Sequence, residues 1–400
     1  MSTQAGATEL VYDPYDYQID EDPHPIWKRM RDEAPLYYNP KYDFYALSRF
    51  QDVLDASLDP QTFISGRGTV IELIDQPMEN PPMIFMDPPQ HTAFRKLVSR
   101  RFTLAQIGRL EPRIRELCAG YLDPFVGAGS FDYVADFGAK LPVMVISSLL
   151  GVPEEDQEQV RIWTDLSLYR APGETGLSQE AAAAMGDIRD YWHGLIRDRR
   201  ARPRDDVMSE LIDVELKERD GDPRKLTDDE LFAFYLLISS AGNETVARFL
   251  GSVGTVLAEF PEQRENLVSN PQKIPNAVEE VLRYEAPSRI QARWCTRDVE
   301  LHGQTLPARS KVGLLTASAN RDEREFPDAD CFDVDRKIDR HVGLGFGIHF
   351  CLGASLARLE GRVAIEETLR RFPHWDVHRD GLERVHTSTV RGYKNVPILY

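Results

Sequence analysis

The sequence predicts a mainly α-helical fold with one long central helix and a few small β-sheets. Along most of the chain, apolar side chains recur at the i, i+3, i+4 spacing of amphipathic helices. One such pattern continues from Thr227 to about Phe260. Strand-like patterns are confined to three short parts of the chain, at about 35–48, 288–315 and 375–400.

The N-terminal half begins with a helix, a hairpin and a long irregular segment. "HPIWKRMRDEAP" has a helical pattern that ends before Pro35, and "LYYNPKYDFYALSR" is typical of a β-hairpin with its turn at Asn39 and Pro40. The proline-rich stretch 67–89 has no regular pattern, and its Ile, Leu and Met content favours a binding loop over a disordered one. Several helices are expected from 90 to about 220, among them one at 103–122 and one at 179–203.

The long helix is interrupted by polar residues near its middle. It begins with a capping box, Thr227 to Glu230, and at ~1.5 Å per residue it should be roughly 50 Å long. "GNET" (242–245) then places polar groups where the pattern calls for apolar ones. Two interpretations remain open. The segment is either a surface stripe that crosses the helix, or a locally opened helix beside a ligand, where Glu244 and Thr245 relay protons.

The C-terminal part contains a glycine-rich loop around one cysteine. A helix at 274–287 and a strand-rich patch at 291–307 precede the loop "GLGFGIHFCLG" (343–353), and a final helix follows it. The glycines are not a dinucleotide-binding fingerprint, because G-x-G-x-x-G starting at Gly345 fails at Phe350. Cys351 lacks the neighbouring sulfur ligands of a zinc or iron–sulfur site, and a buried inert thiol is the common state of a single cysteine. The N-terminus of the following helix favours its thiolate form.

Composition excludes several classes of protein. The net charge of -17 argues against general nucleic-acid binding, which needs a basic face. The N-terminus has no apolar leader, and no window reaches the ~18 apolar residues of a membrane helix, so we expect a cytoplasmic protein. We find no linker, repeat or low-complexity run, which predicts a single domain over 1–400. Neither a disulfide framework nor a zinc cluster is indicated, because the cysteines are scattered: Cys118, Cys295, Cys331 and Cys351.

Four stretches together resemble a known family. "AGNET", Glu280-Val-Leu-Arg283, "ANRDE" (319–323) and "GLGFGIHFCLG" occur in this order and at this spacing, which resembles the cytochrome P450 superfamily in its soluble bacterial form. The resemblance covers nearly the whole chain and implies the helical prism of that family. One position departs from the family pattern: Leu344 stands where the family has a phenylalanine that packs against the haem. The redox potential and the packing under the haem are the properties that this departure affects.

The resemblance implies a set of site residues. Cys351 is implied as the axial ligand of haem b iron, and Glu280, Arg283 and Arg336 as a buried structural ion network. Glu244 and Thr245 are the implied proton-relay pair for O₂ activation, and Gly242 is implied to leave room for O₂. The residues implied to bind the two haem propionates are His91, Arg95, Arg293 and His349. The other residues implied to contact haem are Ala241, Gly242, Leu344, Gly345 and Gly353.

The implied activity is hydroxylation or epoxidation of a hydrophobic small molecule. Electrons are expected from NAD(P)H through a separate ferredoxin and ferredoxin reductase. Lys96, Arg100 and Arg101 form either a docking patch for this partner or an ordinary solvated helix face. The protein is expected to be a monomer. The implied substrate pocket includes the 67–89 loop, the segment 163–173 and the residues Ile238, Ala241, Arg289, Ile290, Gln291, Thr389 and Val390. Arg289 either binds a substrate carboxylate or faces solvent.

Other classes remain as alternatives. A haem-thiolate peroxygenase or isomerase would form product without external reductant. A cysteine hydrolase using Cys351, or a helical binding protein without catalysis, would contain no pigment.

Overall fold

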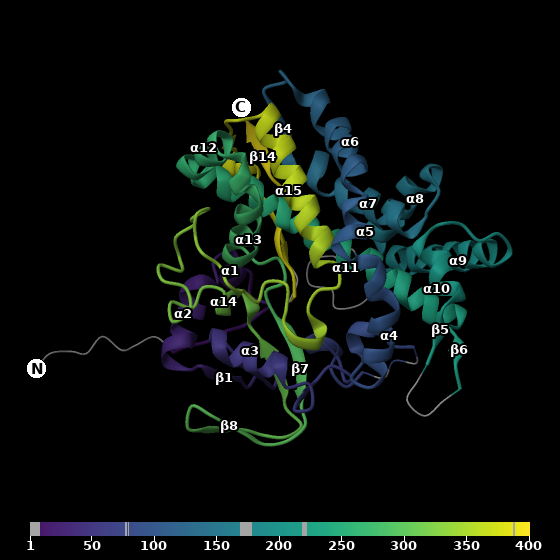
Figure 1. Ribbon diagram of the computed structural model, residues 1–400. Helices are drawn as coiled ribbons and strands as arrows, with labels where there is room; N and C mark the ends of the chain where they lie inside the picture. The colour runs from purple at the N-terminus through teal and green to yellow at the C-terminus, as the bar shows by residue number, and fades with distance from the viewer. Residues whose placement is uncertain (1–8, 77, 79, 169–177, 218–221, 387–388) are drawn as a thin grey trace, which may run out of the picture.

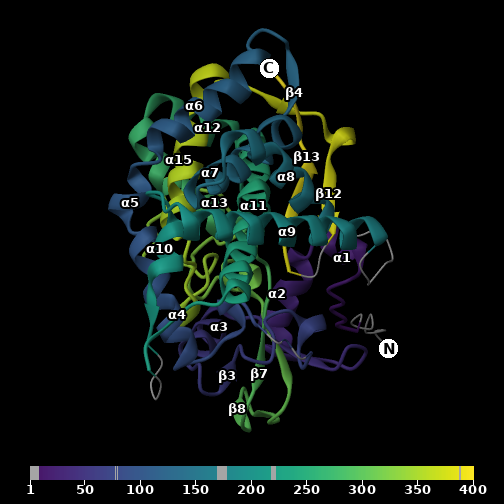
Figure 2. The ribbon, with the colours of Figure 1, turned by 90° about the vertical axis from the view of Figure 1, so that its right-hand side faces the viewer.

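Helix α11 (Asp228–Glu259) runs through the middle of the molecule, and the other elements are arranged around it (Figure 1 and Figure 2). The computed structural model describes residues 9–76, 78, 80–168, 178–217, 222–386 and 389–400. The predicted mainly α-helical class is confirmed. The other α-helices are α1 (Tyr17–Glu21), α2 (His24–Glu33), α3 (Phe50–Leu58), α4 (Gln90–Ser99), α5 (Leu104–Gly108), α6 (Glu111–Leu122), α7 (Lys140–Leu150), α8 (Glu154–Leu168), α9 (Gln179–Ala201), α10 (Val207–Asp213), α12 (Pro261–Ser269), α13 (Ile274–Tyr284), α14 (Thr316–Ala319) and α15 (Ala354–Arg371).

The ends of α11 follow from its local sequence, as predicted. The Thr227 hydroxyl accepts from the Glu230 backbone N–H at 3.2 Å, and the Glu230 carboxylate accepts from the Thr227 N–H at 2.8 Å. This capping box satisfies two otherwise unpaired donors. The helix ends before Pro261, which opens α12. Between these ends the helix is continuous, so the predicted local opening at 242–245 is wrong.

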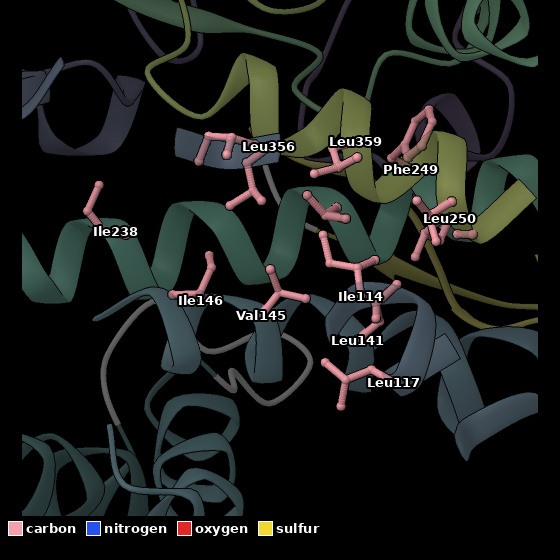
Figure 3. Close-up of a cluster of buried hydrophobic side chains, with 14 of the residues drawn as sticks. Ile114, Leu117, Leu141, Val145, Ile146, Ile238, Phe249, Leu250, Leu356 and Leu359 are labelled. Atoms are coloured by element: carbon pink, nitrogen blue, oxygen red, sulfur yellow. The ribbon is translucent and has the colours of Figure 1, made fainter. Parts of the chain in front are cut away.

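The main core lies on both sides of α11. Helix α15 packs on one side and α7 on the other, and α6 packs against both α15 and α7 (Figure 3). Because both sides are covered, α11 is apolar over much of its circumference and not along one stripe. Side chains labelled in Figure 3 that belong to this core are Ile114, Leu117, Leu141, Val145, Ile146, Ile238, Phe249, Leu250, Leu356 and Leu359.

A five-stranded sheet joins the N-terminal part of the chain to the segment 291–314. Its order is β1 (Leu36–Asn39), β2 (Phe44–Leu47), β10 (Lys311–Leu314), β7 (Gln291–Cys295) and β3 (Phe63–Ile64). Strands β2 and β10 are parallel, and the other pairs are antiparallel. The hairpin predicted at 35–48 is therefore confirmed, with its turn at 40–43, where the Asn39 side chain accepts from two backbone N–H groups.

Smaller sheets involve the remaining strands. The predicted strand-rich C-terminus is confirmed and pairs with a distant strand in the order β11–β14–β4. The strands of these smaller sheets are β4 (Ser130–Asp132), β5 (Glu215–Leu216), β6 (Arg224–Lys225), β8 (Val299–Leu301), β9 (Gln304–Leu306), β11 (Asp376–Val377), β12 (Glu383–His386), β13 (Arg391–Asn395) and β14 (Pro397–Leu399).

The single helix predicted at 103–122 is wrong. The structure has two helices there, α5 and α6, with a break at Arg109 and Leu110. Pro112 explains the break, because proline lacks the N–H of a helical hydrogen bond and its ring clashes with the carbonyl four residues earlier. Proline is tolerated in the first turn, which is where α6 places it.

One apolar helical stretch belongs to the core. Among the described residues, Tyr133–Leu150 is long and apolar enough to cross a membrane by length and composition, with a mean hydropathy of 1.4. It combines the π-helix η5 (Tyr133–Gly138) with α7, and 61% of it is buried inside the protein. Its packing against α11 identifies it as a core segment and not a membrane span.

A buried ion network connects α13 to the segment before the cysteine loop. Glu280 and Arg283 are both fully buried and form two hydrogen bonds of 2.7 Å. The Arg336 Nε contacts the same carboxylate at 3.1 Å. Arg283 also donates to the Asn320, Ala329 and Cys331 carbonyls. The guanidinium groups thus satisfy backbone acceptors that would otherwise be buried without partners.

We predict that Arg283→Met lowers the free energy of unfolding by about 3–5 kcal/mol, because it leaves the Glu280 carboxylate buried without its main counter-charge. Equilibrium urea denaturation measures this change. The matched control is Arg113→Met, which removes two surface ion pairs, with Glu116 and with Glu154, and should cost less than about 1 kcal/mol. Equal losses in the two variants would contradict the prediction.

Candidate active site

The cysteine loop has a backbone that only glycine adopts easily at two positions. Gly345 and Gly347 both have φ of 68°, in the left-handed region. At Gly347 a side chain is also excluded by packing, since an added Cβ would lie 2.2 Å from the Ser57 carbonyl oxygen. The loop closes through a hydrogen bond of 2.9 Å from the Cys351 N–H to the Leu344 carbonyl. The sulfur of Cys351 is thereby held just before α15, as expected.

The thiol of Cys351 lies in a largely dry environment. Burial raises its pKa above the ordinary value, and a hydrogen bond from the Gly353 backbone and the charges of Arg95 and Arg358 only partly offset this. Burial therefore has a larger effect on the pKa than the helix N-terminus, and the thiol form is favoured in the protein without a bound cation. Coordination to a cation would reverse the balance, because metal-bound thiols are deprotonated.

Four cationic or potentially cationic side chains converge beside this loop. His91 and Arg95 come from α4, Arg293 from β7, and His349 from the 3-10 helix η7 (Gly347–His349). The rings of His91 and His349 lie 4.3 Å apart. Arg95 donates to the Phe350 carbonyl at 2.6 Å. The structure thus brings together, from three separate parts of the chain, the four side chains predicted to bind propionates.

Among the described residues, no carboxylate forms an ion pair with this group, and the Asp87 charge that acts on His91 and Arg293 only partly offsets their burial. Burial lowers the pKa of Arg293 to about 10, and burial together with Arg293, His91 and Arg95 lowers that of His349 to about 3. The Nε2 atoms of His91 and His349 are buried and have no hydrogen-bond partner among the described residues. Within that part of the chain, neither Arg95 nor Arg293 has an ion pair, and both donate to neutral oxygens. A ligand with two carboxylates would supply these missing partners, so the residues present fit haem with its two propionates.

The polar segment of α11 is neither opened nor on the surface. Asn243 is buried, and its Oδ1 has no hydrogen-bond partner among the described residues. Glu244 and Thr245 are half-buried. The Thr245 hydroxyl donates to the Ala241 carbonyl at 2.6 Å. A Cβ on Gly242 would lie 2.0 Å from the Ile146 Cδ1, so a larger residue here would displace the end of that side chain on α7.

Several predicted pocket residues have other roles in the structure. Arg289 is 2% exposed and forms an ion pair with Asp20, so it neither faces solvent nor is available to a carboxylate. Ile290 is buried in a core cluster with the N-terminal helices. The amide of Gln291 lies beside Gly345 and accepts from Arg293 at 3.2 Å, which places it with the cationic group.

The remaining predicted pocket residues are placed as follows. Thr389 and Val390 lie beside 288–289, through a hydrogen bond from the Arg289 N–H to the Thr389 carbonyl and a bridge between Ser288 and Val390. Ile238 is nearly buried on α11, and Ala241 is exposed on the same helix. Of the predicted segment 163–173, residues 169–173 lie outside the described part of the chain.

The 67–89 loop borders a cavity, as a binding loop should. It contains two short 3-10 helices, η1 (Ile71–Leu73) and η2 (Met83–Phe85), and is therefore less irregular than predicted. The cavity has a volume of about 370 Å³. Its lining residues are Gly66, Arg67, Gly68, Leu73, Asp75, Gln76, Met78, Pro81 and Phe85.

Two contacts of the cationic group were not predicted. The backbone of Met86 forms a hydrogen bond with His349, and the Gln291 amide contacts Arg293. Backbone contacts leave no residue-type signal, so no pattern could have indicated Met86. Gln291 lies two residues before Arg293 on the same strand, and residues i and i+2 point to the same face. That periodicity could have assigned Gln291 to this group.

Comparison with known proteins agrees with this geometry. The family model described as Cytochrome P450 matches residues 270–391. "Putative cytochrome P450 123" of Mycobacterium tuberculosis is 41% identical over 402 residues, which cover 100% of this chain and 99% of that protein. The "Vitamin D(3) 25-hydroxylase" of Pseudonocardia autotrophica is 37% identical, over 94% of each chain.

A solved structure shows the same fold. The structure of CYP109E1 from Bacillus megaterium in complex with corticosterone superposes with a TM-score of 0.85 and 31% identity, over 96% of this chain and 99% of that one. Relatives of this kind use haem iron and O₂, and they receive electrons from partner proteins. The chain belongs to the cytochrome P450 family and is a haem-thiolate monooxygenase that hydroxylates small molecules.

Proposed function

We propose that Cys351 binds the iron of haem b and that His91, Arg95, Arg293 and His349 bind its two propionates. The observation that carries this proposal is the buried group of four side chains without an acidic partner, next to a cysteine on a glycine-rich loop. When bound, haem supplies O₂ activation: with two electrons and two protons, one oxygen atom enters a C–H bond and the other leaves as water. Other residues that we assign to the haem surface are Ala241, Gly242, Leu344, Gly345 and Gly353.

Leu344 supports the proposed packing on the cysteine side. It is half-buried, packs against the main core, and accepts the hydrogen bond from the Cys351 N–H. Leucine fills less volume than the phenylalanine of the family pattern, so this side of the haem is packed by a smaller apolar group. We therefore propose that ligation by Cys351 persists, while the reduction potential differs from that of relatives with phenylalanine.

Glu244 and Thr245 are the proposed proton-relay pair. The Thr245 hydroxyl donates its proton to the Ala241 carbonyl, so the hydroxyl oxygen is still available as a hydrogen-bond acceptor. It can hold a water molecule that carries protons towards O₂. Glu244 is half-buried on the same turn and can exchange protons with solvent. Both residues favour a monooxygenase over a peroxide-using enzyme, whose oxidant already contains its protons.

The substrate is proposed to be a hydrophobic small molecule. Leu73, Met78, Pro81 and Phe85 contribute apolar groups to the cavity beside the 67–89 loop, which suits such a ligand. We retain Ile238, Ala241, Thr389 and Val390 as pocket residues. Two relatives favour a steroid-like molecule: one is named for vitamin D(3), and the other binds corticosterone.

We propose a ferredoxin, reduced by NAD(P)H through a ferredoxin reductase, as the electron donor. Lys96 and Arg100 are the proposed docking cations, whereas Arg101 is already paired with Glu210. The 400 residues are proposed to act as one catalytic domain and as a monomer in the cytoplasm. The relatives support only the solubility that this proposal requires.

We predict that the purified protein, reduced with dithionite and exposed to carbon monoxide, shows the strongly red-shifted Soret band of thiolate-ligated haem. Cys351→Ser should remove this shift, because a hydroxyl is a much weaker donor than a thiolate. Cys331→Ser is the matched control, since Cys331 is exposed. An unshifted band in the unmodified protein would contradict ligation by Cys351.

We predict that Arg293→Met speeds haem loss by about 10- to 100-fold, because a charge-assisted hydrogen bond contributes about 1.5–3 kcal/mol. Transfer of haem to apomyoglobin measures the rate. Arg297→Met is the control, because Arg297 lies just beyond the same strand but is largely exposed. If both variants retain haem equally well, Arg293 does not bind a propionate.

Thr245→Ala is predicted to uncouple the enzyme, so that most NAD(P)H consumed yields peroxide and not product. Without the hydroxyl acceptor, the water that delivers protons is no longer held in place. The ratio of product to NAD(P)H measures coupling. Thr255→Ala on the same helix removes a comparable bond to a backbone carbonyl and should leave coupling unchanged. Full coupling in Thr245→Ala would exclude the proposed role.

A further inference from the structure

The carboxylate of Asp87 joins the two ends of the 67–89 loop. The Ser65 N–H donates to its Oδ1 and the Gly66 N–H to its Oδ2, both at 2.8 Å. Ser65 directly follows β3 and is 1% exposed, whereas Asp87 lies three residues before α4. A carboxylate that accepts from backbone N–H groups forms charge-assisted hydrogen bonds, which are among the stronger ones in proteins. One side chain therefore connects segments that are more than 20 residues apart in the sequence.

The local sequence permits this close contact. A Cβ on Gly66 would lie 2.5 Å from the Asp87 Oδ2, so a side chain there would displace the carboxylate. At the other end, the Asp87 carbonyl accepts from the His91 N–H at 2.9 Å, in the first turn of α4. The side chain of Asp87 thus fixes the start of the loop, and its backbone fixes the start of α4.

The start of the loop forms one wall of the cavity. Residues 66–68 line it. A hydrogen bond of 2.8 Å from the Ala292 N–H to the Thr69 carbonyl attaches the far end of this stretch to β7. The wall is therefore held at one end by the Asp87 carboxylate and at the other end by the sheet.

The end of the loop reaches the cationic group that is proposed to bind the propionates. The Met86 backbone forms a hydrogen bond with His349. The charge of Asp87 acts on both His91 and Arg293, so its carboxylate lies close to the same group. Asp87 therefore connects the wall of the cavity to the proposed cofactor site.

We propose that Asp87 is a positioning residue for substrate binding: its carboxylate holds the cavity wall 66–68 in a fixed place relative to the haem. The inference rests on the proposed ligation by Cys351 and on the proposed substrate cavity. Asp87 touches neither the iron nor the reacting atoms. Without its carboxylate, the wall would lose its attachment to the segment before α4, and the closed wall would be present in only a fraction of the molecules. The apparent affinity for a bulky ligand falls by that same fraction.

Two iron ligands of different size test this role in the holoenzyme. Imidazole and clotrimazole both bind haem iron through an imidazole nitrogen, and clotrimazole also carries a bulky triaryl group that needs the cavity. In Asp87→Ala, the Kd of clotrimazole should rise by about 10-fold or more, because two charge-assisted hydrogen bonds are lost. The Kd of imidazole should not change. Optical titration of the Soret band measures both constants. An unchanged Kd for clotrimazole, or an equal rise for both ligands, would overturn the proposal.

Two further variants separate positioning from a general loss of stability. Asp59→Ala removes hydrogen bonds from the Gln61 and Thr62 N–H groups to a carboxylate in the turn before β3, and it should leave both constants unchanged. Asp87→Asn keeps the size of the native side chain but has one acceptor oxygen in place of two, so it should weaken clotrimazole binding less than Asp87→Ala does. Equal weakening in Asp59→Ala and Asp87→Ala, or none in Asp87→Asn, would contradict the proposed role.

Hydrogen exchange provides a readout that does not depend on the haem ligand. The buried Ser65 amide should exchange about 10-fold faster or more in Asp87→Ala than in the wild type, because its acceptor is lost. In Asp59→Ala it should exchange at the wild-type rate. An unchanged rate in Asp87→Ala would show that the carboxylate does not hold the loop. Failure of the proposed function would appear separately, as an unshifted Soret band of the reduced wild-type protein with carbon monoxide.

Discussion

The cysteine loop depends on the buried ion network of Glu280, Arg283 and Arg336. Arg283 donates to the Asn320 carbonyl, and the Asn320 side chain accepts from the Val342 N–H at 2.9 Å. Val342 in turn accepts from the Gly345 N–H at 3.0 Å. A short series of hydrogen bonds thus leads from α13 to the backbone that carries the cysteine. The strength of this network comes from its burial, since removing one partner would leave an uncompensated charge without water.

A second constraint is that no acid in the described part of the chain forms an ion pair with the cationic group. His91, Arg95, Arg293 and His349 are brought together by α4, β7 and the cysteine loop, and burial disfavours their charged forms. Two carboxylates of a ligand would offset this cost. The same low-dielectric core raises the pKa of Cys351 and of Glu360. The protein alone therefore contains buried ionisable groups whose charges the proposed iron and propionate contacts would balance.

Much of the fold is predictable because its signals are local. The capping box at Thr227 and Glu230, and the prolines that follow α9 and α11, act within one helical turn. The long helix and its ends could therefore be predicted closely. The apolar spacing is continuous across α5 and α6, so it does not predict the break between them. Pro112, in the first turn of α6, is the local signal of that break. The four family stretches indicate the cytochrome P450 resemblance, and that resemblance implies the group of His91, Arg95, Arg293 and His349.

The sequence by itself determined the helical class, the ends of the longest helix, the cysteine loop and the family to which the chain belongs. Only the tertiary structure decided which distant groups meet. It placed Arg289 against Asp20, packed Gly242 against Ile146, grouped Gln291 with Arg293, and left Glu360 in the core without a partner. The physical reason is that helix caps and turns involve residues a few positions apart, whereas charge pairing and burial depend on neighbours that are remote in sequence. Those neighbours are set by how the whole chain packs.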